Sequence, residues 1–165
     1  MTPETIPFGW RPATGADVPL LAVLYADAAA SLGPLVYTEE QVAAWAANPR
    51  RDPQAFRRYV LDHDTWVAER TSDFAILGFC GIDFDGERRE VHALYVRPSV
   101  TRHGIGTEML RRTLQRARSS GARRFAAWAT PFSRPVFLRA GFEWTQSFTE
   151  SFAGVPFERY RVELG

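Results

Sequence analysis

The sequence predicts a single mixed α/β domain that extends over residues 1–165. The chain has 165 residues, of which 45% are hydrophobic and 24% are charged, a balance typical of one compact domain. Segments with helical and with strand periodicity alternate along the chain. We find no internal repeat, no low-complexity tract and no linker long enough to divide the chain, so we expect one domain.

The N-terminal third predicts one strand followed by three helices. Asp17 is placed to cap the first helix, and Pro19 lies in its first turn. The segment Thr38–Gln41 is typical of a capping box that starts the second helix, which Asn48–Pro49 then ends. The expected elements are a strand at residues 8–11 and helices at 15–30, 38–45 and 52–61.

The rest of the chain alternates between strand and helix periods. Asp83–Gly86 is typical of a hairpin turn between two strands. An amphipathic helix follows a glycine-bearing loop, and Gly121 ends that helix. The expected strands lie at residues 65–69, 74–84, 89–96, 125–129, 142–150 and 157–164, and the expected helices at 107–120 and 133–139.

The basic residues are unevenly distributed. All twenty are arginines, and residues 97–140 hold ten of them together with a single acid, Glu108. The rest of the chain holds ten arginines and eighteen acids. This asymmetry indicates a segment that meets an anion, although solvated helix faces would give the same pattern. The absence of lysine and the abundance of alanine suggest a GC-rich bacterial genome.

Other features exclude several classes of protein. The first ten residues lack the basic and apolar regions of a secretory signal, and no apolar run approaches the roughly 18 residues of a membrane span. The arginine-rich segment lacks the aromatic platform of a nucleic-acid-binding domain. Cys80 is the only cysteine and is typical of a core residue, and His63 is typical of a polar turn, so we expect no metal site. We expect a cytoplasmic protein with no membrane or nucleic-acid partner.

The loop before the long helix contains two glycines, Gly104 and Gly106. The first amides of a helix lack partners, and the helix dipole adds partial positive charge there. Glycines let a phosphate approach the backbone, and Arg102 and His103 add side-chain donors. The loop therefore favours a pyrophosphate cradle, although a plain strand-to-helix turn would have the same glycines. It matches neither a P-loop nor a dinucleotide fingerprint.

Three motifs follow one another along the chain: Leu94–Pro98, the loop Arg102–Gly106 with its helix, and Phe137–Phe142. Together they resemble the GNAT superfamily of acyl-CoA-dependent N-acetyltransferases. The resemblance extends to Arg11–Thr14 and Trp66–Glu69, which look like early strands of the family, so it covers nearly the whole chain. It implies a GNAT-like fold, with a mixed, mostly antiparallel central sheet, splayed fourth and fifth strands and flanking helices.

The resemblance also implies acetyl-CoA as co-substrate, with a place for each of its parts. Where the fourth strand splays from the fifth, Leu94, Tyr95 and Val96 would present backbone groups to the pantetheine arm. An amide near Leu94 would stabilise the oxyanion that develops on the thioester carbonyl. The pyrophosphate would be held by residues of the loop and first helical turn, namely Thr101, Arg102, His103, Gly104, Ile105, Gly106 and Thr107.

Two positions depart from the family pattern. Thr101 stands where the family loop begins with Gln or Arg, and Phe137 stands where many relatives place a tyrosine that protonates the departing thiolate. Because Phe137 has no hydroxyl, the thiolate either leaves without acid catalysis or takes its proton from Ser133, Tyr95 or a bound water, and the sequence does not choose among these. We expect Phe137 to pack against the pantetheine arm, with plain core packing as the alternative.

Glu90 and His92 are the candidates for the general base that takes a proton from the acceptor amine. Some relatives place a catalytic Glu at the start of the fourth strand, and an imidazole with its ordinary pKa near ~6.5 suits base chemistry. Alternation by two predicts that both residues share a face of the strand with Leu94 and Val96. Either candidate could instead be structural, and the sequence leaves the choice open.

The acceptor is predicted to be a cationic primary amine. In this family residues 31–45 would form part of the acceptor wall, where Tyr37, Glu39, Glu40 and Trp45 suit such an amine, although both acids are also good first-turn helix residues. We expect transfer of an acetyl group from acetyl-CoA to an amine of a small molecule or peptide, by direct attack in a ternary complex. A non-catalytic acyl-CoA-binding or regulatory domain is the alternative, and a homodimer remains open.

Overall fold

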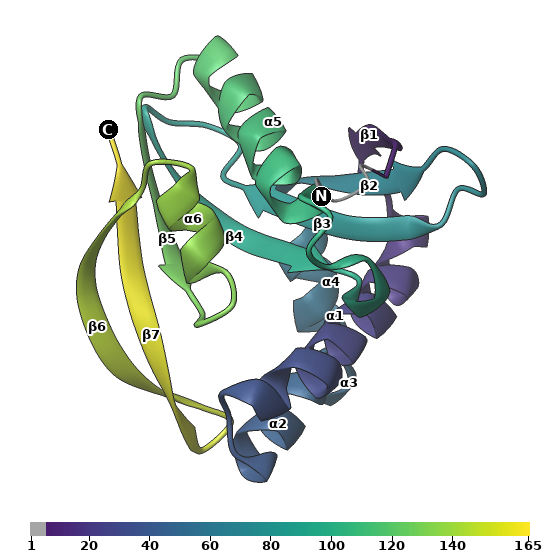
Figure 1. The fold of residues 1–165 in the computed structure, drawn as a ribbon, viewed down its shortest axis with the longest axis vertical. Coiled ribbons are helices and arrows are strands. Elements are labelled where there is room, and N and C mark those ends of the chain that lie inside the picture. Colours follow the sequence, from purple (N-terminus) through teal and green to yellow (C-terminus); the bar gives the residue numbers. More distant parts are fainter. Residues whose placement is uncertain (1–5) are drawn as a thin grey trace.

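The computed structural model describes residues 6–165, which form a seven-stranded sheet with helices on both faces (Figure 1). The strands are β1 (Phe8–Pro12), β2 (Asp64–Arg70), β3 (Ile76–Ile82), β4 (Arg88–Val96), β5 (Arg124–Ala129), β6 (Glu143–Phe152) and β7 (Val155–Leu164). The helices are α1 (Val18–Leu32), α2 (Glu39–Ala46), α3 (Asn48–Arg51), α4 (Pro53–Leu61), α5 (Ile105–Ser119) and α6 (Arg134–Arg139). The first five residues, part of the segment in which we expect no secretory signal, lie outside this description.

The strands are arranged in the order β1-β2-β3-β4-β5-β7-β6. Among these described strands only β4 and β5 pair in parallel, and every other neighbouring pair is antiparallel. The predicted mixed α/β fold, with a mostly antiparallel central sheet and flanking helices, is therefore confirmed.

The helices differ from the predicted ones by up to three residues at their ends, and two of the differences have local reasons. We expect Asn48–Pro49 only to end a helix, but a further short helix, α3, begins there. Proline is accepted in the first turn of a helix, so Pro49 both ends α2 and starts α3. Helix α5 begins at Ile105 rather than at residue 107, which makes the second half of the predicted glycine loop its first turn.

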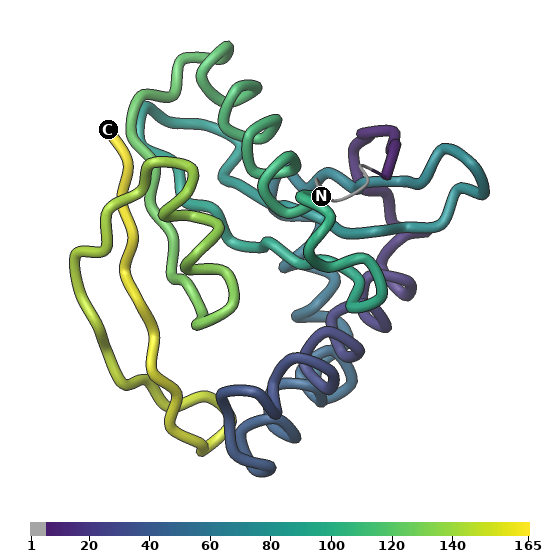
Figure 2. Tube along the Cα trace, in the orientation of Figure 1, coloured from purple at the N-terminus to yellow at the C-terminus, as the bar shows by residue number. Residues whose placement is uncertain are grey.

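Strands β4 and β5 pair along only part of their length. Parallel pairing joins Arg88–Val91 of β4 to Arg124–Ala127 of β5. Figure 2 shows the two segments running side by side and then separating. Because β4 continues alongside β3 as far as Val96, its last residues have β3 on one side and no strand on the other. The predicted splay is confirmed.

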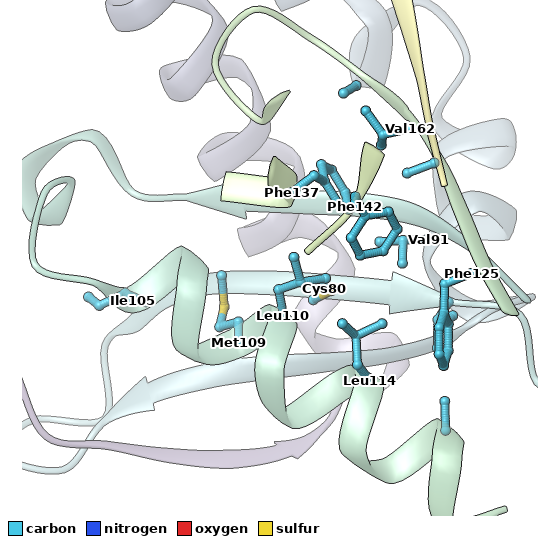
Figure 3. Packing of buried hydrophobic residues seen from close by; sticks show 14 of the residues in the cluster. Cys80, Val91, Ile105, Met109, Leu110, Leu114, Phe125, Phe137, Phe142 and Val162 are labelled. Atoms are coloured by element: carbon cyan, nitrogen blue, oxygen red, sulfur yellow. The ribbon is translucent and has the colours of Figure 1, made fainter. Parts of the chain in front are cut away.

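Two apolar cores lie on opposite faces of the sheet. On one face, Met109 and Leu110 of α5 pack with Phe137 and Phe142, in and just after α6 (Figure 3). Helix α5 carries this buried stripe because its apolar residues recur every three or four positions. On the other face, around Phe79, α1 packs against β3 and β4, and α4 packs against β2. The side chains of β4 are therefore divided between the two cores: Leu94 and Val96 pack in the first, and Ala93 and Tyr95 pack in the second.

The helical stretch 15–35 is long and apolar enough to cross a membrane by length and composition. The stretch is not one uninterrupted apolar run, because Asp17 and Asp27 lie within it. In the fold, Leu21 and Leu24 of α1 are buried in the second core. Core helices meet the same criterion, so this stretch is weak evidence for a span.

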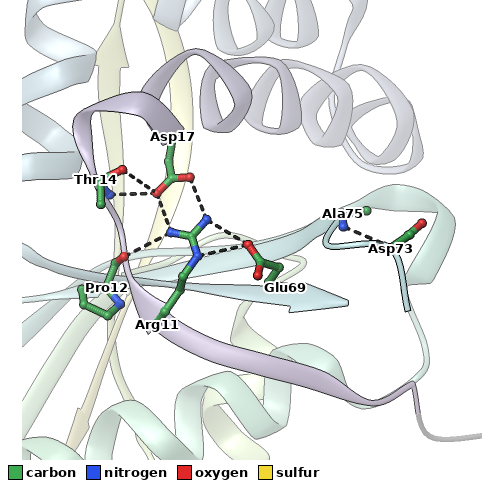
Figure 4. A network of polar contacts seen from close by, with 7 residues as sticks. All are labelled: Arg11, Pro12, Thr14, Asp17, Glu69, Asp73 and Ala75. Atoms are coloured by element: carbon green, nitrogen blue, oxygen red, sulfur yellow. Dashed lines mark hydrogen bonds and ion pairs between the residues drawn. The ribbon is translucent and has the colours of Figure 1, made fainter. Parts of the chain in front are cut away.

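A polar network joins β1 and β2 to the start of α1 (Figure 4). Arg11 donates to both carboxylate oxygens of Asp17, at 2.8 and 2.9 Å, and its Nε donates to Glu69 at 3.1 Å. Asp17, which is buried, also accepts from the amide of Thr14 at 2.8 Å. Asp17 holds the predicted N-cap position of α1, but its side chain caps the preceding turn instead.

Replacing Asp17 by asparagine should destabilise the protein by about 2 kcal/mol at neutral pH, because the Arg11 guanidinium would lose its charged acceptor. Hydrogen bonds from Arg11 hold the pKa of Asp17 below its ordinary value, against the opposing effect of burial. The stabilisation is therefore present above about pH 4 and is lost as the pH falls through the lower pKa of the folded state.

Urea unfolding of both proteins over a range of pH measures this effect. The wild type and D17N should differ at neutral pH and converge as the pH falls. D85N, which changes an exposed carboxylate in the β3–β4 turn, is the matched control and should change stability little at any pH. Equal destabilisation by the two variants would contradict the network's role.

Candidate active site

A cleft of about 860 Å³ opens where β4 and β5 separate. Its walls come from β4, the loop and first turn of α5, α6 with the segment before it, and aromatic residues of the other helices and β7. The predicted site residues that line it are His92, Leu94, Tyr95, Val96, Thr101, Arg102, Gly104, Ile105, Gly106, Thr107, Ser133 and Phe137. Glu90 and His103 are not among the lining residues.

At one end of the cleft, the start of α5 presents a row of backbone amides. The amide of Glu108 donates to the Gly104 carbonyl at 3.0 Å, so the amides of residues 105–107 precede the first helical hydrogen bond. The N-cap residue is Gly104, which has no side chain with which to cap these amides. Arg102 and Gly104 have φ of 68° and 75°, which curves the loop into a concave turn. Such turns bind anions.

The side chains around this turn differ in their availability. The Thr101 hydroxyl donates to the Pro98 carbonyl at 3.0 Å, so its proton is already engaged within the loop. Arg102 lines the cleft, and so does Arg139 at the end of α6. Sequence reasoning counts Arg139 in the arginine-rich segment but does not assign it to the site. Its only sequence signal is a position two residues after Phe137.

The free edge of β4 offers backbone groups in the middle of the cleft. The amide of Arg97 donates to the Leu77 carbonyl at 2.7 Å, so the backbone of Arg97, and of Tyr95 two residues earlier, faces β3. The backbone groups of Leu94 and Val96 therefore point toward the opening left by β5. The expectation that Tyr95 also presents its backbone is corrected: Tyr95 lines the cleft through its side chain.

A β-bulge changes which residues of β4 share a face. The register of β3 and β4 shifts by one between Gly81 and Ile82, which leaves His92 as an extra residue on β4. Beyond the shift, Leu94 and Val96 pack with the core under α5, whereas His92 stacks on a ring from the other face. The predicted common face is therefore wrong, because the extra residue reverses the alternation.

His92 belongs to a compact polar cluster at the cleft. Its Nε2 lies 2.6 Å from Oδ1 of Asp83, and its carbonyl accepts from the Tyr59 hydroxyl at 2.8 Å. Partial burial acts to raise the pKa of Asp83, but hydrogen bonds from the Glu90 amide and the His92 ring outweigh it and hold this pKa below its ordinary value. Asp83 is therefore a carboxylate at neutral pH, and it orients the imidazole.

Glu90, the other predicted base, is engaged in an ion pair. Its Oε1 accepts a hydrogen bond from Nη1 of Arg161 at 3.1 Å, and the Arg161 side chain is only 12% exposed. The same guanidinium lies over the ring of Trp128, 4.9 Å from its centroid. Of the two candidates, only His92 is among the residues that line the cleft.

His63, Asp83 and His92 place potential ligand atoms within 4.8 Å of one another. The two imidazoles, however, are stacked, with ring centroids 3.9 Å apart and planes only 21° from parallel. The lone pair of an imidazole nitrogen lies in the plane of its ring, so stacked rings do not direct two lone pairs at one ion. Nδ1 of His63 also lies 2.8 Å from the Tyr59 carbonyl. We therefore assign this cluster to hydrogen bonding rather than to a metal.

Ser133 and Phe137 form the α6 side of the cleft. The Ser133 hydroxyl accepts from the Thr130 amide at 2.9 Å, and the Thr130 hydroxyl accepts from the Ser133 amide at 3.1 Å. Phe137 is 2% exposed and packs edge-on against Phe142, with ring centroids 5.0 Å apart. Because Phe137 also lines the cleft, it contributes both to the core and to the wall.

Aromatic side chains form the remaining wall of the cleft. Tyr37 lies edge-on to Trp45 and to Phe157, with ring centroids 5.6 and 5.3 Å apart. The ring centroid of Tyr25 in α1 lies 4.7 Å from that of Tyr95 in β4. Sequence reasoning identifies Tyr37 and Trp45 but misses Tyr25, whose position in the apolar stripe of α1 gives no sign that it reaches the site.

The charges at the aromatic wall differ from those predicted. Glu39 and Glu40 are exposed on the first turn of α2 and lie outside the lining, so the expectation that they face the acceptor is wrong. Among residues 6–165, no Asp or Glu side chain lines the cleft, whereas Arg159 of β7 does. The sequence prediction also misses Arg159. Its place in the cleft depends on the register in which β7 pairs with β5 and β6, which the sequence pattern does not show.

A family model described as an acetyltransferase (GNAT) domain matches residues 35–164. The chain belongs to the GNAT acetyltransferases. Members of this family use acetyl-CoA as the acyl donor. The cleft fits that molecule in two ways: the amide row of α5 suits its diphosphate, and the free edge of β4 suits its extended pantetheine arm.

Solved structures of similar fold include two with a cofactor bound. A GCN5-related N-acetyltransferase from Rhodopseudomonas palustris has 22% identity and a TM-score of 0.85, covering 99% of this chain and 97% of its own. The paia N-acetyltransferase of Thermoplasma acidophilum, in complex with coenzyme A, has 14% identity, a TM-score of 0.76 and coverages of 95% and 98%. The protein yncA of Salmonella typhimurium, with acetyl-CoA, has 19% identity, a TM-score of 0.63 and coverages of 96% and 93%. No curated protein matches the chain significantly.

Replacing Gly104 by valine should weaken acetyl-CoA binding, while the unliganded protein stays folded but loses some stability because valine is strained at the positive φ of this position. A Cβ at Gly104 meets no atom within 4 Å, so the new side chain would extend into the anion turn rather than into the core. Thermal unfolding with and without acetyl-CoA measures the effect, since a ligand at ~100 times its dissociation constant stabilises by about 2.7 kcal/mol. The G104V variant should lose most of this stabilisation.

Gly154 offers a matched control in the β6–β7 turn. It has φ of 77° and likewise nothing within 4 Å of a Cβ, so G154V imposes similar backbone strain away from the α5 loop. G154V should keep the full acetyl-CoA shift. A full shift in G104V would show that the diphosphate binds elsewhere.

Proposed function

We propose that this GNAT acetyltransferase transfers the acetyl group of acetyl-CoA to a primary amine of a small molecule or peptide, by direct attack in a ternary complex. One observation carries the proposal: a single cleft is lined by the amide row of α5, the free edge of β4 and the residue His92. A donor bound along the first two would present its acetyl group to an acceptor held at the aromatic wall. Acetyl-CoA supplies the acetyl thioester.

Donor binding would depend mainly on the backbone. The amides of residues 105–107 and the Arg102 guanidinium would hold the diphosphate, the anion predicted from the arginine-rich segment. The backbone groups of Leu94 and Val96 would bind the pantetheine arm as an added strand. A backbone N–H on this edge would also donate to the thioester oxygen and stabilise the negative charge that develops there.

His92 is the proposed general base. A primary ammonium group with an ordinary pKa near ~10.4 must lose a proton before the amine attacks. Asp83 engages Nε2 of the ring, which leaves Nδ1 to accept that proton directly or through a water. Glu90 stays the second candidate, but its ion pair with Arg161 and its place outside the lining favour His92.

Coenzyme A is proposed to leave as a thiolate without a protein acid. Phe137 has no hydroxyl, and burial raises the pKa of Tyr95 well above its ordinary value, which makes that phenol a poor proton donor. A thiol with a pKa near ~8.5 is a tolerable leaving group at neutral pH. Acid catalysis typically adds ~10²–10⁴-fold, so we expect a slow enzyme.

A non-catalytic acyl-CoA-binding or regulatory domain is the second candidate function, favoured by Phe137 and by the engaged hydroxyl of Thr101. Thiol release from acetyl-CoA, measured over polyamines, aminoglycosides, amino acids and peptides, distinguishes the two. Tight acetyl-CoA binding without thiol release for any amine would favour the binding domain. The cytoplasmic location, the lack of membrane and nucleic-acid partners, and a homodimer stay predictions.

Replacing His92 by glutamine should lower kcat by roughly 10²–10⁴-fold and leave acetyl-CoA binding nearly unchanged, because the base would be lost but the cradle would not. The variant should also lose the limb of the kcat–pH profile that reports the base. D83N, which removes the group that positions the ring, should lower kcat by a smaller factor and shift the same limb.

E90Q is the control for these variants, because it disrupts a neighbouring ion pair outside the cleft lining. It should change kcat only a few-fold. If E90Q instead caused the larger loss and abolished the pH limb while H92Q did not, Glu90 would be the base.

A further inference from the structure

Arg159 is a half-buried cation in the lining of the cleft. Among the described residues, no acidic side chain forms an ion pair with it. The contrast lies two positions along the same strand, where Arg161 pairs with Glu90 at 3.1 Å and lies 3.6 Å from Glu163. The chain thus supplies counter-ions to one of these two arginines and none to the other.

Strand geometry directs Arg159 into the cleft. Side chains of a strand alternate between faces, so Phe157, Arg159 and Arg161 lie on the same face of β7. Phe157 packs on Tyr37, with ring centroids 5.3 Å apart, and Arg161 lies over Trp128. Arg159 lies between these two along β7 and lines the same cleft as the aromatic wall.

The positive charge of Arg159 acts to lower the pKa values of nearby tyrosines in the cleft, which burial raises. Burial raises the pKa of Tyr37 to about 12, and the positive charge of Arg159 acts in the opposite direction. The same charge opposes the effect of burial on the pKa of Tyr25 and of Tyr59. These three residues come from different segments around the cleft, so the guanidinium acts on its interior.

An unpaired cation in a largely aromatic wall is costly, because burial removes water that would otherwise solvate the charge. No Asp or Glu among residues 6–165 lines the cleft, so this chain does not provide the compensating anion. In the proposed donor complex, Arg102 and the α5 amides would already hold the diphosphate. A guanidinium in this setting matches a carboxylate, which it can bind with two parallel hydrogen bonds.

We propose that Arg159 binds a carboxylate of the acceptor, which makes the acceptor an amino-acid-like molecule with a primary amine and a carboxylate on an aromatic or apolar frame. This inference rests on the proposed acetyl transfer. The amine would meet His92, the carboxylate would meet Arg159, and the rings of Tyr37 and Trp45 would contact the frame. The acceptor predicted to be cationic would then be a zwitterion whose ammonium group gives its proton to His92 before the free amine attacks the thioester.

Matched acceptors that differ only in the carboxylate test the proposal. Thiol release is measured at saturating acetyl-CoA for phenylalanine against phenethylamine, for tryptophan against tryptamine, and for 3-amino-3-phenylpropanoate, which lengthens the spacing. In the wild type, at least one carboxylate acceptor should exceed its decarboxylated partner in kcat/KM by roughly 10- to 100-fold. R159M should remove this preference by lowering kcat/KM for the carboxylate acceptor alone, and R159K should restore part of it.

R58M is the matched control, since Arg58 is an exposed arginine of α4 outside the cleft lining. It should keep the wild-type preference. If the decarboxylated amines react as well as the acids, or if R159M lowers both classes equally, the inference is overturned while the proposed acetyl transfer stands. If acetyl-CoA neither binds nor reacts, the proposed function itself fails.

If no acceptor of the panel reacts, the role of Arg159 is tested by the binding of two acetylated products, one with a carboxylate and one without. N-acetylphenylalanine and N-acetylphenethylamine are titrated into the protein with coenzyme A present, and the change in intrinsic tryptophan fluorescence, to which the cleft residues Trp45 and Trp128 contribute, is followed. Tighter binding of the acid, lost in R159M and kept in R58M, supports the proposal. Equal binding of both products, or binding of neither, overturns it.

Discussion

The separation of β4 from β5 after Val91 is the constraint on which the site depends. A strand inside a sheet has its amides and carbonyls paired on both sides, whereas the last residues of β4 have β3 on one side only. The same separation opens the cleft between the two cores of the sheet. Unpaired backbone groups and space for a ligand therefore arise together, from one interruption of strand pairing.

The bulge at His92 separates the direction of the His92 side chain from that of the residues that follow it on β4. It lets Leu94 and Val96 keep their side chains in the α5 core while the backbone at those positions faces the opening. It also turns His92 toward Asp83 and the aromatic face. Donor contacts and the candidate base can thus come from neighbouring residues of one strand without competing for the same space.

The cleft is lined by cations and backbone amides, while the nearby acids are paired with basic residues. Backbone amides and Arg102 provide positive potential at the start of α5, while the acids near the cleft are engaged, Glu90 with Arg161 and Asp83 with His92. Acids that are paired in this way do not repel an anionic ligand as free carboxylates would. Both proposed ligands, a diphosphate and a carboxylate, are therefore anions that meet cations and amides within a lining free of acids among the described residues.

The sequence alone determined the features that depend on neighbouring residues: the capping box of Thr38 and Gln41, the buried stripe of α5, and the glycine turn at Gly104. Each is set within one or two helical turns, so residue type and spacing suffice to predict it. Tertiary structure alone decided the bulge at His92, the capture of Glu90 by a residue 71 positions away, and the direction of Arg159. These depend on strand register, and because one extra residue reverses every later side chain, no local pattern encodes them.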